Sequence, residues 1–347
     1  MNLKKLVAII AVVGIIIAGI ITFYVYNQAF TANTTFNQKE VFVYVPTNST
    51  YEQAKEIISP FVKDIEKFDF VAQKRNYNSN VKAGKFLLKK DMTTFDIVRA
   101  MKSNVPVKLA FNNQETLEKL AERITTQVEP KKEELLAAFL NPDFLASNGF
   151  TEETVLAMFI PNTYEFYWNT SGEKIAEKMA SEYKRFWNEE RTAKALDKNL
   201  TPIQVAVLAS IVHKETAKVD ERPRVAGVYL NRLALNMPLQ ADPTVIYAMK
   251  KNSGDFDQII KRVYSKDTQG TISPYNTYIN QGLPPGPITM PDISAIDAVL
   301  NAEKHDYIYF CASVERMGYH EFASNYAAHQ VNARKYADWV NKLGINR

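Results

Sequence analysis

The hydrophobic pattern of the chain opens with one long apolar run. No charged residue occurs between Leu6 and Tyr26, two lysines precede the run, and the next charge is Lys39. About 20 apolar residues in a helix cross a hydrocarbon core of roughly 30 Å. A cleaved signal peptide has a shorter apolar core, of about 7–15 residues, followed by small residues at a cleavage site. The pattern therefore predicts a retained transmembrane helix over residues 6–26, with residues 1–5 cytoplasmic and the remainder outside.

Beyond this helix the pattern changes to short alternating elements. Residues 27–40 are polar, and we interpret them as a tether. A β-branched and aromatic stretch at 41–45 predicts a strand. A helix around 51–62, a turn and strand at 83–88, and a helix capped by Thr93 follow. These elements predict a small α+β module over residues 41–105.

Two further regions follow the module. Residues 106–160 predict a connecting α+β segment, with a strand from Val107 and helices at 116–126 and 131–140. From about Pro161 the chain becomes rich in aromatic and turn residues, and a helix is expected at 174–188. We assign residues 161–347 to a larger mixed domain, so the predicted fold class is α+β.

The stretch from Thr201 to Glu215 predicts a helix buried in the core of that domain. Thr201 is suited to the N-cap and Pro202 to the first helical position. Residues 205–212 are apolar on almost every side, as in a helix surrounded by protein. Glu215 follows one turn after Ile211, on the face that the apolar residues continue.

Glu215 is the candidate catalytic residue. A carboxyl group at the negative end of a helix dipole, against apolar neighbours, is expected to have a raised pKa. A general acid that works near neutral pH needs such a pKa. The segment alone leaves open the alternative of an ordinary solvated glutamate at a helix end.

Two other chemistries can be tested on the same helix. His213 and Glu215 point in nearly opposite directions and cannot share a metal, and the other histidines lack zinc-site spacing. Ser210 and Lys214 share a face, so a Ser/Lys hydrolase is sterically allowed. Ser210 lies in an apolar stretch, however, where serine is usually a small packing residue.

Polar and aromatic residues gather downstream of this helix. Aromatic rings interleaved with amide and hydroxyl groups suit sugars, which offer apolar faces and a rim of hydroxyls. The alternative is a loop-rich surface in which tyrosines serve packing. The predicted substrate-binding residues are Gln240, Asp242, Tyr275, Asn276, Thr277 and Tyr278, followed by a stiff loop at 282–287.

Composition narrows the function further. The net charge is only +4 and no long basic block occurs, which argues against nucleic acid as a partner. The single cysteine, Cys311, cannot form an internal disulfide. Its apolar surroundings predict a buried thiol in a core strand rather than a nucleophile.

Several long motifs in register resemble one family. The stretches "PNTYEF", "LASIVHKET", "ERPRVAGVYLNRL", "LQADPTVIYAM", "YNTY" with "GLPPGPI", and "HEFASNYAAHQ" resemble the MltG/YceG-like endolytic murein transglycosylases. They occur in family order over about residues 160–335. The membrane helix and the module after it also fit, the module then being LysM-like.

The resemblance implies an activity. Members cleave the β-1,4 bond between N-acetylmuramic acid and N-acetylglucosamine in peptidoglycan and leave a 1,6-anhydro end, as lyases without metal or organic cofactor. The family's catalytic glutamate matches Glu215. Many members carry an acidic residue where this chain has His213, so no carboxylate can act at that position.

The implied setting is the outer side of the cytoplasmic membrane. There the enzyme cuts nascent glycan strands, ends their elongation and meets peptidoglycan synthases as partners. A tether of roughly 14 residues reaches at most about 50 Å. The alternative from another class of function is a non-catalytic, peptidoglycan-binding scaffold of the wall-synthesis machinery.

Overall fold

The computed structural model describes residues 3–342, and these divide into two compact units. The first unit comprises the described residues up to 109, with 127–130 and 164–170. The second comprises 110–126, 131–163 and the described residues from 171 onward. Strands pair in three two-stranded sheets, β1 with β2, β3 with β4, and β5 with β6. The mixed α+β class predicted from the sequence is therefore present.

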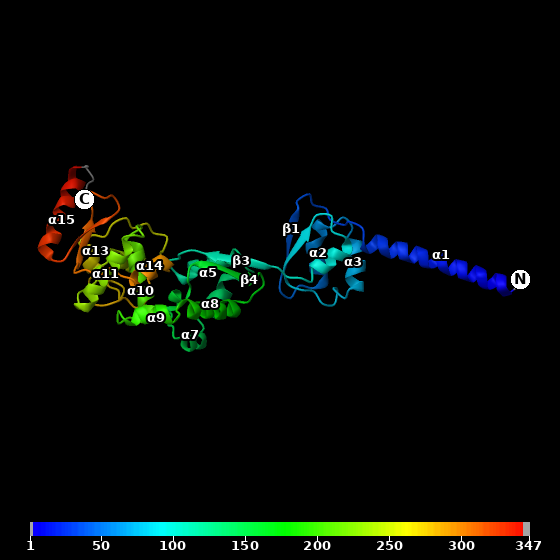
Figure 1. Cartoon of the computed structure of the whole chain (residues 1–347), viewed down its shortest axis with the longest axis horizontal. Coiled ribbons are helices and arrows are strands. Elements are labelled where there is room, and N and C mark those ends of the chain that lie inside the picture. The colour runs from blue at the N-terminus through cyan, green and yellow to red at the C-terminus, as the bar shows by residue number, and fades with distance from the viewer. Residues whose placement is uncertain (1–2, 343–347) are drawn as a thin grey trace. The chain divides into compact units, whose positions relative to one another are not determined.

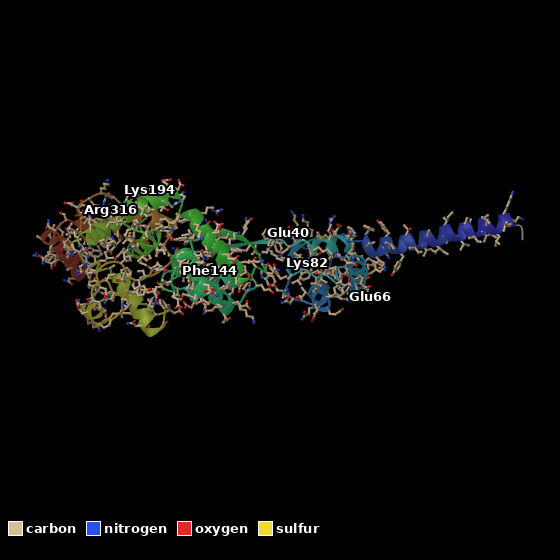
Figure 2. The ribbon with its side chains drawn as sticks, turned by 90° about the horizontal axis from the view of Figure 1, so that it is seen from below. Glu40, Glu66, Lys82, Phe144, Lys194 and Arg316 are labelled. Carbon is tan, nitrogen blue, oxygen red and sulfur yellow. The ribbon has the colours of Figure 1, made fainter. Side chains whose placement is uncertain are left out.

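The first unit begins with the apolar helix α1 (Leu3–Ala29), drawn in blue in Figure 1. Before its last turns, its side chains stand free on all sides (Figure 2), and large apolar residues such as Ile15 are 73% exposed. The helix is long and apolar enough to cross a membrane. Exposed apolar side chains over this length are unfavourable in water but suit a lipid environment.

A strand–helix–helix–strand unit follows α1. The antiparallel strands β1 (Glu40–Val45) and β2 (Gly84–Lys89) pair with Val43 opposite Phe86. Between them lie α2 (Tyr51–Ile58), the short 3-10 helix η1 (Ser59–Phe61) and α3 (Ile65–Lys74), and α4 (Thr94–Ala100) comes after β2. The sequence predicts both strands, α2 and α4 but misses α3, which starts at the side-chain cap of Asp64.

Residues 27–40, interpreted from the sequence as a tether, are packed against this unit. Asn33 is 1% exposed, and its side chain forms two hydrogen bonds with the backbone of Asp64. Asn33 Nδ2 donates to the carbonyl oxygen of Asp64 at 2.9 Å, and the backbone N–H of Asp64 donates to Asn33 Oδ1 at 2.9 Å. The backbone N–H of Asn33 donates to Met92, and its C=O accepts from Lys63. Polar composition alone suggests a free linker, but here the polar groups pair with backbone groups of α3 and of the turn before α4.

The second unit is mostly helical and carries the large C-terminal region. Its helices up to the central one are α5 (Leu117–Thr125), α6 (Lys132–Phe139), α7 (Pro142–Asn148), η2 (Val155–Met158), α8 (Gly172–Phe186), α9 (Glu189–Leu196) and α10 (Pro202–Glu215). After it come α11 (Arg222–Ala234), α12 (Asp242–Ser253), α13 (Ser265–Gly270), α14 (Ile293–Leu300), β5 (Tyr309–Ala312), β6 (His320–Ala323) and α15 (Tyr326–Lys342). The boundary between the units falls inside two strands, β3 (Pro106–Phe111) and β4 (Asn162–Tyr167).

Helix α10 is the centre of the second unit. It packs against α9, α11, α12 and α14, and residues 205–212 are all buried. Thr201 and Gln204 form a capping box, with Gln204 N donating to Thr201 Oγ1 at 3.2 Å and Thr201 N to Gln204 Oε1 at 2.8 Å. Each large aliphatic side chain buried here contributes roughly 1.5–3 kcal/mol. The predicted buried helix is therefore present, from the expected cap to Glu215.

The proline-rich loop at 282–287 braces α10 from the side. Gly286 lies so close to the backbone of Glu153 that a Cβ atom there would meet its carbonyl oxygen at 1.9 Å. Just after the loop, Ile288 N donates to Ser210 Oγ at 3.0 Å. The sequence predicts a stiff loop here, after the predicted binding residues, and in the structure residues 282–285 line a different cavity from that of Glu215, with Leu200, Ile203 and Val207.

The docking of residues 27–40 can be tested by removing the Asn33 side chain. We expect Asn33→Ala to lower the stability of the first unit by about 1–3 kcal/mol, because the backbone N–H and C=O of Asp64 lose buried partners. Urea unfolding of the full chain, followed by limited proteolysis of this unit, measures the change. Asn78→Ala, at an exposed position of the same unit, is the control. Equal stability of the two variants would mean that the segment is a free tether.

Candidate active site

A polar cavity opens where α10 ends. Its volume is about 250 Å³, and Glu215 lies in its wall. The lining residues come from α10, α11, the loop before α12 and its first residue, the loop before α14, and the β5–β6 pair: Glu215, Tyr229, Arg232, Leu239, Gln240, Asp242, Tyr278, Phe310, Cys311, Ala312 and His320.

The carboxyl group of Glu215 is desolvated at the end of its helix. Burial raises its pKa from 4.5 to about 7, against the effect of the Tyr229 hydroxyl, which donates to Oε1 at 2.5 Å. The negative charge of Asp242 raises the pKa further, and the Arg232 guanidinium lowers it. Near neutral pH the group can therefore hold a proton and release it, as a general acid must.

Arg232 builds one side of the cavity. It is 7% exposed, and its Nε donates to the carbonyl of Ile308 at 2.7 Å. Its Nη1 donates to the carbonyl of Leu239 at 2.8 Å. One guanidinium thus ties α11 to the approach of β5 and to the loop before α12. Its charge also lies close enough to Glu215 to favour the carboxylate.

Three of the predicted substrate-binding residues line the cavity. Tyr278 donates its hydroxyl to Asp242 Oδ1 at 2.6 Å, which fixes a phenol and a carboxylate side by side. Gln240 has φ +51°, a left-handed conformation that is unusual for a residue other than glycine. The hydrogen bond from Gln240 N to Thr277 O, at 3.1 Å, holds it there. Backbone strain of this kind is often found at functional sites.

The other three predicted binding residues are buried away from the cavity wall. Asn276 is fully buried, donates to the carbonyls of Thr268 and Thr271, and accepts from Tyr278 N. Thr277 Oγ1 accepts from Ala241 N at 3.0 Å and pairs with Thr244.

Tyr275 packs its ring on Tyr247 at 4.8 Å between centroids. In this structure, Tyr275, Asn276 and Thr277 all contact protein. Asn276 and Thr277 also place residues that line the cavity, because Tyr278 N donates to Asn276 and Gln240 N donates to Thr277.

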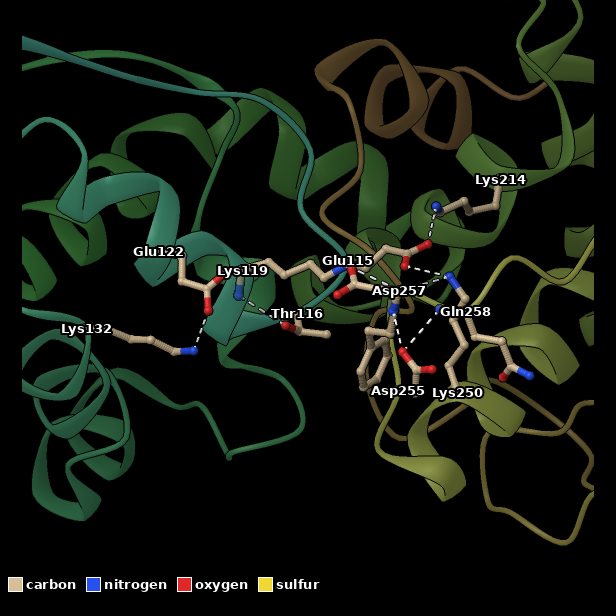
Figure 3. Close-up of polar contacts among 11 residues, drawn as sticks. Glu115, Thr116, Lys119, Glu122, Lys132, Lys214, Lys250, Asp255, Asp257 and Gln258 are labelled. Atoms are coloured by element: carbon tan, nitrogen blue, oxygen red, sulfur yellow. Dashed lines mark hydrogen bonds and ion pairs between the residues drawn. The ribbon is translucent and has the colours of Figure 1, made fainter.

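The neighbours of Glu215 on α10 face other directions. Lys214 Nζ contacts Glu115 Oε1 at 2.6 Å, and Lys250 Nζ contacts Oε2 at 2.9 Å (Figure 3). Burial disfavours ionisation of Glu115, but the two lysines outweigh it and lower its pKa. Ser210 is fully buried and donates to Val207 O at 2.7 Å. The Ser210/Lys214 hydrolase is therefore wrong: the lysine is bound to Glu115, and the serine is enclosed in the core.

His213 also points away from Glu215. Its Nδ1 lies 3.1 Å from Asp292 Oδ2, and the same carboxylate oxygen accepts from Arg222 Nη1 at 3.2 Å. Burial lowers the pKa of His213, even though Asp292 opposes this. The residue does not line the cavity, so the departure from the family pattern at this position leaves the surroundings of Glu215 unchanged.

The sequence analysis misses Tyr229, Arg232 and His320. His320 Nδ1 lies 2.9 Å from Glu221 Oε2, and its backbone N–H donates to Oε1 of the same carboxylate at 2.7 Å. Glu221 is only 5% exposed. Two of the quoted motifs, "ERPRVAGVYLNRL" and "HEFASNYAAHQ", contain all four residues. The ionisable and hydroxyl side chains within those motifs are the sequence signal that could have identified these residues.

Cys311 lies on β5 at the cavity wall, half-buried rather than within the core. Burial raises the pKa of its thiol, and the nearby charge of Glu321 adds to the effect. The thiol is therefore protonated at neutral pH, as expected for a cysteine that is not a nucleophile.

Fold and cavity together define an α+β protein with a partly buried acid in the wall of a polar cavity of about 250 Å³. The chain belongs to the YceG-like family, whose model matches residues 43–335. The crystal structure of a YceG-like protein from Listeria monocytogenes superimposes with a TM-score of 0.56 at 29% identity, over 84% of this chain and 98% of that one.

Curated relatives carry an enzyme name. The endolytic murein transglycosylase of Streptococcus pneumoniae serotype 2 is 30% identical over 334 residues, which cover 87% of this chain and 59% of the relative. That of Bacillus subtilis strain 168 is 28% identical over 289 residues, 77% of either protein. The chain thus spans about three fifths of the pneumococcal relative's length.

The raised pKa of Glu215 has a consequence for stability. The folded state holds the proton more tightly than the unfolded chain, so stability falls as pH rises from about 4.5 to about 7. Glu215→Gln removes this titration and keeps an acceptor for Tyr229. We expect the variant to gain stability over the wild type across this window, reaching roughly 3 kcal/mol above it. Urea unfolding at pH 4, 6 and 8 measures the difference. A pH-independent difference would mean an ordinary solvated carboxyl group.

Proposed function

We propose that the chain is a lytic transglycosylase of peptidoglycan. It cleaves the β-1,4 bond between N-acetylmuramic acid and N-acetylglucosamine and leaves a 1,6-anhydro end. The observation that carries the proposal is the carboxyl group of Glu215, desolvated in a polar cavity with a pKa of about 7 and held by the Tyr229 hydroxyl. The enzyme name of the relatives agrees with it.

Glu215 acts twice in the proposed reaction. Its proton passes to the leaving glycosidic oxygen as the C1–O bond breaks. The resulting carboxylate then takes the proton of the muramic acid 6-hydroxyl while that oxygen bonds to C1, which restores the acid. Tyr229 and Arg232 stabilise the carboxylate between the two steps, by a hydrogen bond and by charge. Because the nucleophile belongs to the same sugar, proximity replaces a bound water.

The remaining polar groups of the cavity orient the sugar. Gln240 offers an amide, and the Asp242–Tyr278 pair offers a carboxylate and a phenol at fixed separation. Asn276 and Thr277, predicted as direct contacts, support these residues from behind. Tyr275, also predicted as a direct contact, packs on Tyr247 instead. We therefore assign substrate contact to Gln240, Asp242 and Tyr278.

His320 is a further contact residue in this proposal. Glu221 accepts from its Nδ1, which leaves Nε2 as the ring nitrogen that can meet substrate. Because His320 lines the cavity, Nε2 can form a hydrogen bond with a polar group of the sugar. The buried carboxylate of Glu221 keeps the ring in this orientation.

The helix α1 supplies the proposed location. It anchors the protein in the cytoplasmic membrane with the N-terminus inside, because its lysines precede the apolar run. The folded units then lie outside, where glycan strands emerge from the membrane-bound synthases that we expect as partners. The strand–helix–helix–strand order of residues 40–89 supports a LysM-like, glycan-binding module.

Replacing the acid tests the reaction. We expect Glu215→Gln to abolish the formation of 1,6-anhydro ends, because an amide cannot protonate the leaving oxygen. The products of isolated peptidoglycan are separated and weighed by mass spectrometry, which distinguishes anhydro ends from hydrolysed ends by one water. Glu177→Gln, an exposed position on α8, is the matched control. Anhydro products from Glu215→Gln would remove this residue from the mechanism, and none from the wild type would favour the scaffold.

Substitution of the histidine tests its assigned contact. We expect His320→Ala to lower kcat/KM by about tenfold, the value of one hydrogen bond of ~1.5 kcal/mol to substrate. Glu221→Gln is expected to act in the same direction, because Nδ1 loses the acceptor that fixes its proton. Initial rates of anhydro-product release measure both, with Glu315→Gln in the β5–β6 turn as the control. Wild-type rates for His320→Ala in folded protein would exclude this contact.

A further inference from the structure

The last turns of α1 pack against α3 and α4 through aromatic rings. Tyr24 meets Phe70 edge to face at 5.7 Å, and Phe30 stacks on Phe95 at 5.6 Å. Between these two contacts, Lys67 Nζ lies 3.4 Å from Asn27 Oδ1 and 3.2 Å from Thr31 Oγ1. The helix therefore enters the first unit at a fixed place, in contrast to a helix joined to its domain by a flexible linker.

The length of α1 determines the depth of these contacts. With a rise of 1.5 Å per residue, the uncharged segment from Leu6 to Val25 spans about 30 Å, the thickness of the hydrocarbon core. Tyr24 then lies at its outer edge. Phe30 follows the end of α1 and lies about 7 Å beyond Val25, within the headgroup layer. Phe70 and Phe95 lie at the same depths, because their rings contact these two.

Cationic groups surround the two phenylalanines. Lys74 Nζ lies 5.9 Å from the centroid of the Phe70 ring, and the Arg75 guanidinium 4.8 Å from that of Phe95. Lys67 and Lys74 lie on the face of α3 that carries Phe70. Lys74 and Arg75 are exposed.

Two acidic residues near this face bind other side chains of the unit. Asp69 accepts from Tyr51 at 2.6 Å, and Asp96 pairs with Arg99 at 2.9 Å. Glu66 is exposed at the same end of the module (Figure 2), and Asp64 accepts from the backbone N–H groups of Glu66 and Lys67 at the start of α3.

We propose that the face formed by Phe30, Lys67, Phe70, Lys74, Arg75 and Phe95 is a docking surface for the anionic phospholipid headgroups of the membrane that α1 spans. This inference rests on the proposed membrane anchor and goes beyond it. Aromatic rings favour the interfacial layer, and lysine or arginine side chains there attract anionic lipids. The first unit then lies on the lipid surface in one orientation. On a flexible tether it would instead move freely within the length of the tether.

The surface can be tested in the full chain with tryptophan probes. Phe70→Trp and Phe95→Trp are reconstituted in two kinds of vesicle, one of phosphatidylglycerol and one of phosphatidylcholine. Both lipids are brominated near the top of their acyl chains. Bromine quenches tryptophan on contact, and the signal of the three native tryptophans is subtracted. Phe42→Trp, on β1 of the same unit and 41% exposed, is the control. We expect fluorescence loss at positions 70 and 95 and none at 42.

A second comparison isolates the charges. Lys74→Glu/Arg75→Glu, placed in the Phe70→Trp chain, is expected to reduce the quenching in phosphatidylglycerol vesicles. Lys82→Glu/Lys108→Glu makes the same change of charge at exposed positions of the unit and is expected to leave it unaltered. Equal quenching in both double variants would overturn the role assigned to anionic lipid.

A fourth probe separates failure of the docking from failure of the anchor. Ile16→Trp lies in the middle of α1 and is quenched by lipid brominated deep in its acyl chains if the helix spans the bilayer. Quenching at Ile16→Trp without any at positions 70 and 95 would overturn the docking surface and leave the anchor intact. Absence of quenching at Ile16→Trp would overturn both.

Discussion

Burial of the Glu215 carboxyl group is the constraint on which the rest of the second unit depends. A charged carboxylate at the negative end of a buried helix is unfavourable, so the group keeps its proton to about pH 7. The protein can hold it there because Tyr229 donates to one oxygen and Arg232 supplies a positive charge nearby. In the proposed reaction, the same features that disfavour the ionised group in the resting protein prepare it to give up a proton and then to carry a charge briefly.

The surrounding structure serves to keep this arrangement rigid. Ser210 in the middle of α10 accepts the backbone N–H of Ile288, so the proline-rich loop supports the helix from behind. Arg232, on α11, binds carbonyl groups of two further segments, the approach to β5 and the loop before α12. The buried Thr244–Thr277 pair joins the start of α12 to the loop that carries Tyr278. Most of these polar groups are buried and satisfied, which favours a single conformation of the cavity wall.

The first unit combines an exposed apolar helix with a folded unit that has its own core. A helix as apolar and exposed as α1 is unfavourable in water, while the strand–helix–helix–strand unit next to it buries its apolar residues in a core of its own. The two are joined through Asn33 and through the aromatic contacts at Tyr24 and Phe30. In the proposed role of α1 as a membrane anchor, this rigid attachment restricts the orientations open to the unit beside it, whereas a flexible tether would restrict only the distance of the unit from the membrane.

The sequence by itself determined the elements whose signals are local. Hydropathy predicted α1, the Thr201–Pro202 start and apolar run predicted α10, and position at the helix end singled out Glu215. Tertiary structure decided what long-range contacts create. Tyr229 reaches Glu215 from another helix, Glu221 holds His320 across 99 residues, and Tyr275, Asn276 and Thr277 turn inward although they look like surface polar residues. Periodicity and capping report on neighbours along the chain. Polar composition cannot tell a free segment from one whose hydrogen bonds are satisfied by distant backbone, as in residues 27–40.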